Sequence, residues 1–177
     1  MGDQALVFYD EIAYGPHERN TLDLLLPEGP GPFPLYFYVH GGGFTGGDKD
    51  AAFRNTGLIE ALIRADVAVA TTGYRLLGQQ EDVVEGKGVL ASMRDSMRAL
   101  QFIRWHAEEL GIDPDRIAGE GSSAGAGTVL WLGTHDDMAE PNAEDPVARQ
   151  STRLSAVSAL ETQATYDIVR WEEVFEE

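Results

Sequence analysis

The pentapeptide Gly121-Ser122-Ser123-Ala124-Gly125 decides how this chain is interpreted. It follows the strand-like run Arg116-Ile117-Ala118 and precedes a helical run. This is the G-x-S-x-G pattern of a nucleophile elbow, in which a strand turns sharply into a helix and holds a serine at the bend. Glycines are needed on either side because the turn is crowded, and a side chain there would collide with the neighbouring strand or helix. Ser123, at the centre, is therefore the candidate nucleophile, and Ser122 is interpreted as structural.

A second motif, His40-Gly41-Gly42-Gly43-Phe44, lies about eighty residues upstream, at the end of the apolar run Leu35-Tyr36-Phe37-Tyr38-Val39. Glycine loops of this HGGG type supply backbone N–H groups to a developing oxyanion. The alternative is a flexible loop without chemistry. The oxyanion interpretation is preferred because both motifs occur in the expected order, each directly after a predicted strand.

The predicted elements alternate between strands and helices, which indicates an α/β fold with a mostly parallel central sheet. Hydrophobic periodicity and turn residues predict them in this order: a hairpin of strands 5–13 and 21–26, strand 35–39, helix 51–64, strand 67–71, helix 89–110, a strand leading to the elbow, helix 123–133, a polar loop 140–150, strand 154–160 and a short helix 167–175. Gly111 is expected to end the long helix.

In this order, the features resemble the α/β-hydrolase superfamily. Within it, the chain is similar to the hormone-sensitive-lipase-like and the acetyl- and feruloyl-esterase-like carboxylesterases. The resemblance runs from about Leu22 to Thr134 and is carried by HGGGF, Gly73-Tyr74-Arg75-Leu76, Asp113-Pro114-Asp115-Arg116-Ile117 and GSSAG. It implies an α/β-hydrolase fold with helices on both faces of the sheet. It also implies hydrolysis of carboxylic esters without a cofactor, through an acyl-enzyme on Ser123.

The resemblance assigns the oxyanion donors to the backbone N–H groups of Gly42, Gly43 and Ala124. Losing one such donor typically lowers the rate about 10²–10³-fold. The expected substrates are small or short-chain acyl esters, with acetyl and feruloyl esters of polysaccharides as candidates.

The base that activates the serine is the missing component. In this fold the acid and the histidine follow the nucleophile in sequence, and His135 is the only histidine after Ser123. An unbroken helix would separate the two by about 18 Å. Asp167, after the last predicted strand, is only a remote candidate for the acid, so the catalytic acid and histidine are expected to be absent from this chain. Residues 1–177 would form a partial domain without its C-terminal strands, inactive by itself.

Two other functions stay open. Gly119-Glu120-Gly121-Ser122-Ser123-Ala124 also satisfies the relaxed dinucleotide fingerprint G-x-G-x-x-[GA], which would suggest an oxidoreductase. That interpretation leaves HGGGF unexplained. The missing histidine supports the second alternative, a non-catalytic hydrolase-like fragment or binding module.

Other conspicuous residues are interpreted as structural. Tyr74 and Arg75 are expected to anchor the exit of a central strand through buried hydrogen bonds. Trp105, Trp131 and Trp171 are expected to be packing residues.

Composition limits the partners. The formal charge of −17, from 30 acidic and 13 basic residues, opposes binding to nucleic acids and anionic membranes. The chain has no cysteine, and its four histidines lack metal-ligand spacing, so no metal site is predicted. No apolar run approaches the ~20 residues of a membrane span, and no signal peptide is visible. We expect a cytoplasmic protein that binds a small ester and can form a homo-oligomer.

Overall fold

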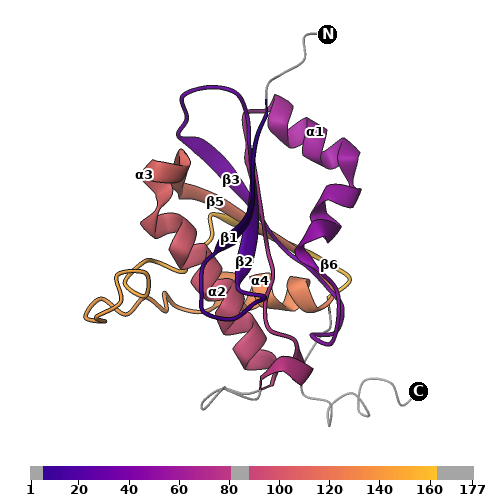
Figure 1. The fold of residues 1–177 in the computed structure, drawn as a ribbon, viewed down its shortest axis with the longest axis vertical. Helices are drawn as coiled ribbons and strands as arrows, with labels where there is room; N and C mark the ends of the chain where they lie inside the picture. Colours follow the sequence, from indigo (N-terminus) through magenta and orange to yellow (C-terminus); the bar gives the residue numbers. More distant parts are fainter. Residues whose placement is uncertain (1–5, 81–87, 163–177) are drawn as a thin grey trace.

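The computed structural model describes residues 6–80 and 88–162 and contains one six-stranded sheet in the order β1-β2-β4-β3-β5-β6 (Figure 1). The strands are β1 Val7–Ala13, β2 Thr21–Leu26, β3 Phe33–Val39, β4 Ala68–Thr72, β5 Ile112–Ser122 and β6 Ala156–Leu160. The helices are the 3₁₀ turns η1 Lys49–Arg54 and η2 Leu77–Gln79, and the α-helices α1 Thr56–Arg64, α2 Val89–Trp105, α3 Ala107–Leu110 and α4 Ala124–Thr134.

The sheet is mostly parallel, as predicted. Strand β3 is parallel to both β4 and β5, and β5 is parallel to β6, whereas β1 and β2 form an antiparallel hairpin at one side. Val39, the last residue of β3, pairs with Gly121 of β5. The carboxyl ends of these two strands therefore lie side by side, and the loops that follow them meet at one edge of the sheet, where ligands of open α/β sheets bind.

Helices cover both faces of the sheet. Figure 1 places α1 on the opposite side from α2 and α3. Strand β3 explains why, because alternate residues of a strand point to opposite faces. Leu35, Phe37 and Val39 join the larger core with residues of α2 and α4, while Tyr36 joins the smaller core with residues of α1.

Two predicted helices are each divided in the structure. The predicted helix 51–64 is η1 followed by α1, because the Asn55 side chain accepts a hydrogen bond from Leu58 N–H (3.3 Å) and starts a new helix. The predicted helix 89–110 is α2 followed by α3, with the break at His106. Gly111 ends α3 with φ +67°, as predicted. The predicted helix 167–175 lies outside the described residues.

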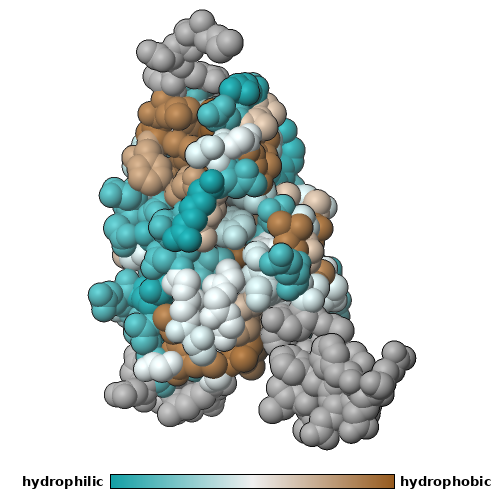
Figure 2. Space-filling model, turned by 90° about the vertical axis from the view of Figure 1, so that its right-hand side faces the viewer, coloured by the Kyte–Doolittle hydropathy of each residue, from teal (hydrophilic) through white to brown (hydrophobic). Residues whose placement is uncertain are grey.

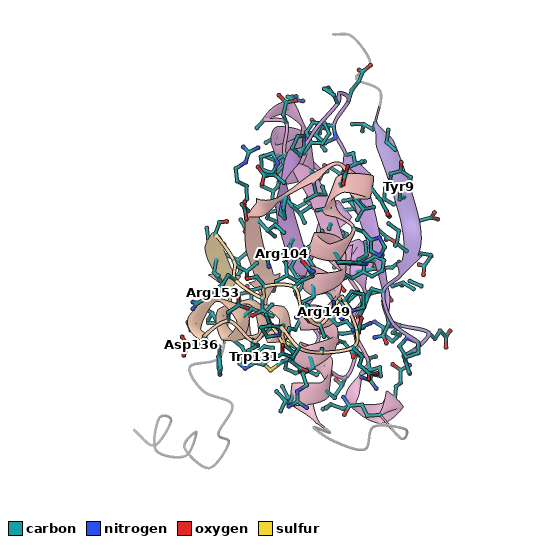
Figure 3. The ribbon with its side chains drawn as sticks, turned by 90° about the vertical axis from the view of Figure 1, so that its left-hand side faces the viewer. Tyr9, Arg104, Trp131, Asp136, Arg149 and Arg153 are labelled. Atoms are coloured by element: carbon teal, nitrogen blue, oxygen red, sulfur yellow. The ribbon has the colours of Figure 1, made fainter. Side chains whose placement is uncertain are left out.

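Arginines hold the long connection between α4 and β6. Arg104 of α2 donates to the backbone oxygens of Ser151 (2.6 Å) and Arg153, and Arg98 pairs with Asp145 (2.5 Å). Figure 3 shows Arg104 beside this connection, with Arg149 and Arg153. The polar loop is therefore ordered without a helix or strand of its own.

The edge strand β1 exposes apolar side chains. Leu6, Val7, Phe8 and Tyr9 are each between 43 and 52% exposed. Figure 2 shows an apolar area near the top of the molecule, where β1 begins. Across the described residues, no helix combines the length and the apolar character that a membrane crossing requires.

Candidate active site

Ser123 lies at a strained bend between β5 and α4. Its backbone angles are φ +53° and ψ −115°, a conformation that residues other than glycine rarely adopt. Its N–H donates to the Leu160 carbonyl (2.8 Å) at the end of β6, and its own carbonyl accepts from Gly127 N–H (3.1 Å) in α4. The bend is thus fixed by hydrogen bonds on both sides.

The two glycines of the pentapeptide are required by close packing. A Cβ on Gly121 would collide with Gly125 and would lie 2.6 Å from Ala126 N. A Cβ on Gly125 would collide with the Val39 carbonyl group and would lie 2.7 Å from His40 O. The steric prediction is confirmed: one glycine clears the helix and the other clears the neighbouring strand.

The glycine loop returns sharply toward Ser123. The carbonyl of Gly42 accepts hydrogen bonds from Thr45 N–H (3.0 Å) and Gly46 N–H (3.1 Å), which close the loop. Gly42 and Gly43 have φ of +112° and +61°. A Cβ on Gly41 would lie 3.3 Å from the Ser123 Cβ. Gly41 is thus the glycine that adjoins the serine, a position that the sequence did not distinguish from the other two.

The three predicted oxyanion donors are backbone N–H groups, two in the glycine loop and one at the start of α4. Within the described residues, no backbone or side-chain acceptor is recorded for the N–H groups of Gly42 and Gly43. Ala124 is the first residue of α4, and N–H groups in the first turn of a helix have no acceptor inside that helix. Their assignment as oxyanion donors stays a prediction.

His40 is buried at the base of the loop and is 1% exposed. Its Nδ1–H donates to the Gly41 carbonyl (2.7 Å), and its ring stacks on Tyr74 with centroids 4.1 Å apart. Burial lowers the pKa of His40 below 6.5, despite the opposing hydrogen bond to Gly41. Among the described atoms Nε2 has no partner, which suits a neutral ring that carries its proton on Nδ1. His40 is therefore part of the loop's framework.

The remaining histidines also make local contacts. His135 ends α4, which is unbroken from Ala124, and its Nδ1 donates to the Trp131 carbonyl (2.9 Å). His106 Nδ1 lies 2.8 Å from a Glu109 carboxylate oxygen, and His17 Nδ1 accepts from the Arg19 N–H (3.1 Å). Each of these three rings thus has a local partner.

Three aspartates that follow the elbow have structural partners. Asp145 pairs with Arg98 (2.5 Å), Asp137 accepts from the Thr152 N–H (2.9 Å), and Asp136 lies 3.6 Å from Arg153. Asp167, a remote candidate for the triad acid, lies outside the described residues. No group of three or more histidine, aspartate or glutamate side chains within residues 6–80 and 88–162 is arranged to bind a metal ion.

Tyr74 and Arg75 anchor the exit of β4, as predicted. The Tyr74 hydroxyl donates to the carbonyls of His40 (2.9 Å) and Gly41 (3.3 Å). Arg75 makes a bidentate pair with Asp95 of α2, at 2.9 and 2.7 Å. Through these two hydrogen bonds Tyr74 also holds the start of the glycine loop in place, a contact that the sequence did not predict.

The tryptophan prediction holds for one residue and fails for another. Trp131 packs against the larger core. Trp105 is 48% exposed at the end of α2, outside the core. Trp171 lies outside the described residues.

The packing around Gly119 argues against a dinucleotide site. In that fingerprint the first glycine forms the tight turn after the strand. Here Gly119 lies inside β5, which continues to Ser122. A Cβ on Gly119 would lie 2.7 Å from Leu154 Cδ1 and 3.4 Å from Val129 Cγ1. These side chains cover the position, so a pyrophosphate has no access to it.

Several known proteins are similar to this chain in sequence. Probable isoprenylcysteine alpha-carbonyl methylesterase ICMEL1 of Arabidopsis thaliana is 33% identical over 151 residues, which cover 84% of this chain and 29% of that protein. Carboxylic ester hydrolase LipN of Mycobacterium tuberculosis is 35% identical over 101 residues, covering 56% of this chain and 24% of LipN. This chain therefore spans less than a third of either relative.

Solved structures are similar to this chain in fold. The acetyl ester-xyloside bifunctional hydrolase from Caldicellulosiruptor lactoaceticus superposes with a TM-score of 0.62 and 25% identity, covering 77% of this chain and 47% of that one. Thermogutta terrifontis esterase 2 gives a TM-score of 0.65 at 21% identity, covering 86% and 55%. The observed sheet and these neighbours are those of the α/β-hydrolase fold. A family model, BD-FAE, matches residues 22–175, and the chain belongs to this family.

Proposed function

We propose that the whole protein is a serine carboxylic-ester hydrolase, and that residues 1–177 form the part of its α/β-hydrolase domain that carries the nucleophile and the oxyanion loop. One observation carries the proposal: a Cβ on Gly41 would lie 3.3 Å from the Ser123 Cβ. The glycine loop and the elbow, about eighty residues apart in sequence, thus adjoin at the carboxyl ends of paired parallel strands.

The chemistry follows from this arrangement. The Ser123 hydroxyl attacks the ester carbonyl carbon and loses its proton to a base, and the carbonyl oxygen becomes an oxyanion. The N–H groups of Gly42, Gly43 and Ala124 stabilise this charge. Collapse of the tetrahedral intermediate expels the alcohol and leaves an acyl-serine, which water hydrolyses. All four histidines of this chain make other contacts, so we assign the base and its carboxylate partner to other parts of the whole protein.

The proposed substrates are small or short-chain acyl esters. The names of the relatives support the ester class: methylesterase, carboxylic ester hydrolase and acetyl ester-xyloside hydrolase. Acetyl and feruloyl esters of polysaccharides are the candidates that we would test first. A hydrolase-like module without activity is the alternative that the occupied histidines favour.

A fluorophosphonate probe tests the nucleophile in the whole protein. We expect the probe to label Ser123, located by peptide mapping. Ser123→Ala should abolish labelling and lower kcat/KM for p-nitrophenyl acetate by about 10⁴-fold or more. Ser122→Ala is the matched control, because it removes the adjacent hydroxyl, and it should keep both properties.

Other results would reject the proposal in different ways. Labelling at Ser122 would move the nucleophile by one residue. A folded whole protein that neither reacts with the probe nor hydrolyses esters would establish the non-catalytic alternative.

A further inference from the structure

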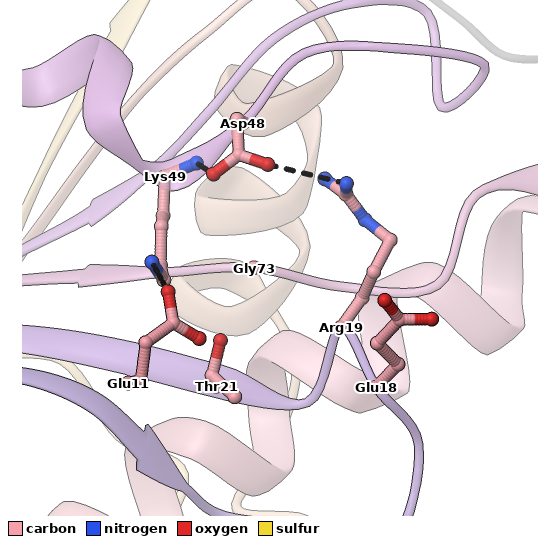
Figure 4. Close-up of a pocket in the computed structure, with 7 residues that line it drawn as sticks. All are labelled: Glu11, Glu18, Arg19, Thr21, Asp48, Lys49 and Gly73. Atoms are coloured by element: carbon pink, nitrogen blue, oxygen red, sulfur yellow. Dashed lines mark hydrogen bonds and ion pairs between the residues drawn. The ribbon is translucent and has the colours of Figure 1, made fainter.

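A polar pocket of about 190 Å³ lies between the β1–β2 hairpin and the segment that follows the glycine loop. Figure 4 shows Arg19 entering it from the hairpin and Asp48 and Lys49 from the opposite side. Glu11, Glu18 and Thr21 also line the pocket from the hairpin. The pocket thus lies between the hairpin and the segment that contains Asp48 and Lys49, and charged side chains connect the two across it.

Arg19 makes three contacts outside the hairpin. Its Nη2 donates to the Gly47 carbonyl (2.8 Å) and its Nε donates to the Tyr74 carbonyl (3.0 Å). Its Nη1 pairs with an Asp48 carboxylate oxygen at 3.2 Å. The Arg19 side chain is 18% exposed. A guanidinium has five N–H donors in a fixed plane, so one side chain can hold three acceptors in a defined mutual geometry.

Both backbone acceptors of Arg19 belong to residues that touch the start of the glycine loop. A Cβ on Gly47, which has φ +88°, would lie 2.5 Å from Gly41 O and 2.7 Å from His40 Nδ1. Tyr74 contacts the same two loop residues through its hydroxyl, which donates to the carbonyls of His40 and Gly41. Arg19 therefore binds both Gly47 and Tyr74, the two residues that contact the Gly41 carbonyl oxygen.

We propose that Arg19 is a positioning residue for the oxyanion loop, and that it acts through Gly47 and Tyr74 without touching the substrate. The inference rests on the proposed function only for its catalytic consequence. The structural consequence stands alone: without Arg19, the turn from Gly42 to Gly46 loses its outer support. Because oxyanion donors act mainly on the transition state, a displaced loop should lower kcat more than it raises KM.

Lys49 is a second, separate anchor, which keeps the loss of Arg19 local. Its Nζ lies 2.5 Å from Glu11 and 3.1 Å from Asp23. Glu11 reaches it because β1 has a register irregularity between Tyr9 and Ile12, where Glu11 adopts φ +53°. This pair holds the hairpin against η1, so the hairpin should remain docked in an Arg19 variant.

Hydrogen–deuterium exchange in the whole protein tests the inference directly. The reporters are the Thr45 and Gly46 amides, whose hydrogen bonds to Gly42 O close the loop. Arg19→Met keeps the apolar stem and removes every donor. It should raise exchange at these amides about tenfold or more. Arg19→Lys, a point donor that cannot reach three acceptors, should give an intermediate increase.

Arg64→Met is the matched control. It removes an arginine whose ion pair with Glu60 (2.8 Å) lies on the exposed face of α1, and exchange at Thr45 and Gly46 should not change. With a short-chain p-nitrophenyl ester, Arg19→Met should lower kcat about tenfold or more and leave KM within about twofold.

Unchanged exchange at Thr45 and Gly46 in a folded Arg19→Met protein would overturn the inference. So would an equal increase throughout the sheet, because that is global destabilisation. If Arg19→Met does not fold, amide exchange at Thr45 and Gly46 in Arg19→Lys tests the inference instead. Since exchange needs no turnover, an inactive wild-type protein would reject the proposed function and leave the test of Arg19 intact.

Discussion

At the scale of single residues, Ser123 has a strained backbone conformation that hydrogen bonds from neighbouring elements hold in place. A non-glycine residue in such a conformation costs about 1–3 kcal/mol and persists only where neighbouring structure imposes it. Here the imposing contacts are hydrogen bonds to Leu160 of β6 and Gly127 of α4. The strain places the serine at the bend between β5 and α4, instead of within the strand or the helix. The motif predicted the residue, and the structure supplies the physical reason for its conformation.

Gly41 and Arg19 mark the limits of residue-level prediction. The HGGG motif predicted a loop beside the serine, but three successive glycines carry no signal that identifies which one adjoins it. Arg19 belongs to no motif, and its two backbone acceptors, Gly47 and Tyr74, are 28 and 55 residues away in sequence. Contacts of this kind depend on the register of the sheet, which the sequence pattern did not determine.

The buried imidazole of His40 makes stability depend on pH. Burial lowers its pKa below 6.5, so the folded protein resists protonation of this ring while the unfolded chain accepts the proton. Stability should be independent of this group above about pH 7.5 and should fall as the pH decreases through 6.5. One proton limits the slope to about 1.4 kcal/mol per pH unit. Urea denaturation between pH 5.5 and 8 measures it, because carboxylates titrate mainly below this range.

Substitution separates His40 from the other histidines. His135→Gln removes an exposed imidazole at the end of α4 and should keep the slope. His40→Gln should remove it, and the C2 proton of His40, followed by NMR in the wild type, should titrate below pH 6.5. A slope that survived in a folded His40→Gln protein would show that another group causes it.

At the scale of elements, the arrangement of strands and helices could be predicted because their hydrophobic periods are strong. The divisions within helices could not. The break at His106 separates two segments that share one helical pattern, and Asn55 starts α1 through a side-chain hydrogen bond that periodicity does not reveal. The irregularity of β1 at Glu11 is a comparable case in a strand, since its φ of +53° accompanies a contact with Lys49 of η1.

The elbow glycine Gly125 fixes how closely α4 approaches β3. Gly125→Ala should lower the free energy of unfolding by about 1–3 kcal/mol, because the added methyl group collides with the Val39 carbonyl and α4 must shift. Equilibrium urea denaturation measures the change. Gly57→Ala is the matched control: a Cβ there meets nothing within 4 Å, and Gly57 lies in α1. That variant should be about 0.5–1 kcal/mol more stable than the wild type. Equal effects of the two substitutions would contradict the packing argument.

At the scale of the whole molecule, charge is the dominant feature. Acidic residues outnumber basic ones by 30 to 13, and several arginines are already engaged, for example Arg75 with Asp95 and Arg98 with Asp145. The chain therefore carries a large excess of negative charge, and like charges repel and weaken the compact state. This property follows from composition alone and needs no structure to predict.

Salt should therefore stabilise the protein. Between 0.02 and 0.5 M NaCl the screening length falls from roughly 20 Å to about 4 Å, so repulsion between surface carboxylates weakens. Ion pairs weaken as well, but exposed pairs contribute only about 0–1 kcal/mol each. We expect a net rise in Tm of about 3–6 °C, measured by calorimetry.

The double variant Glu140→Lys, Glu144→Lys changes two exposed residues and the formal charge from −17 to −13. It should gain less from salt than the wild type. A Tm that stayed constant or fell with salt would mean that local ion pairs, rather than net repulsion, determine the stability of this acidic surface.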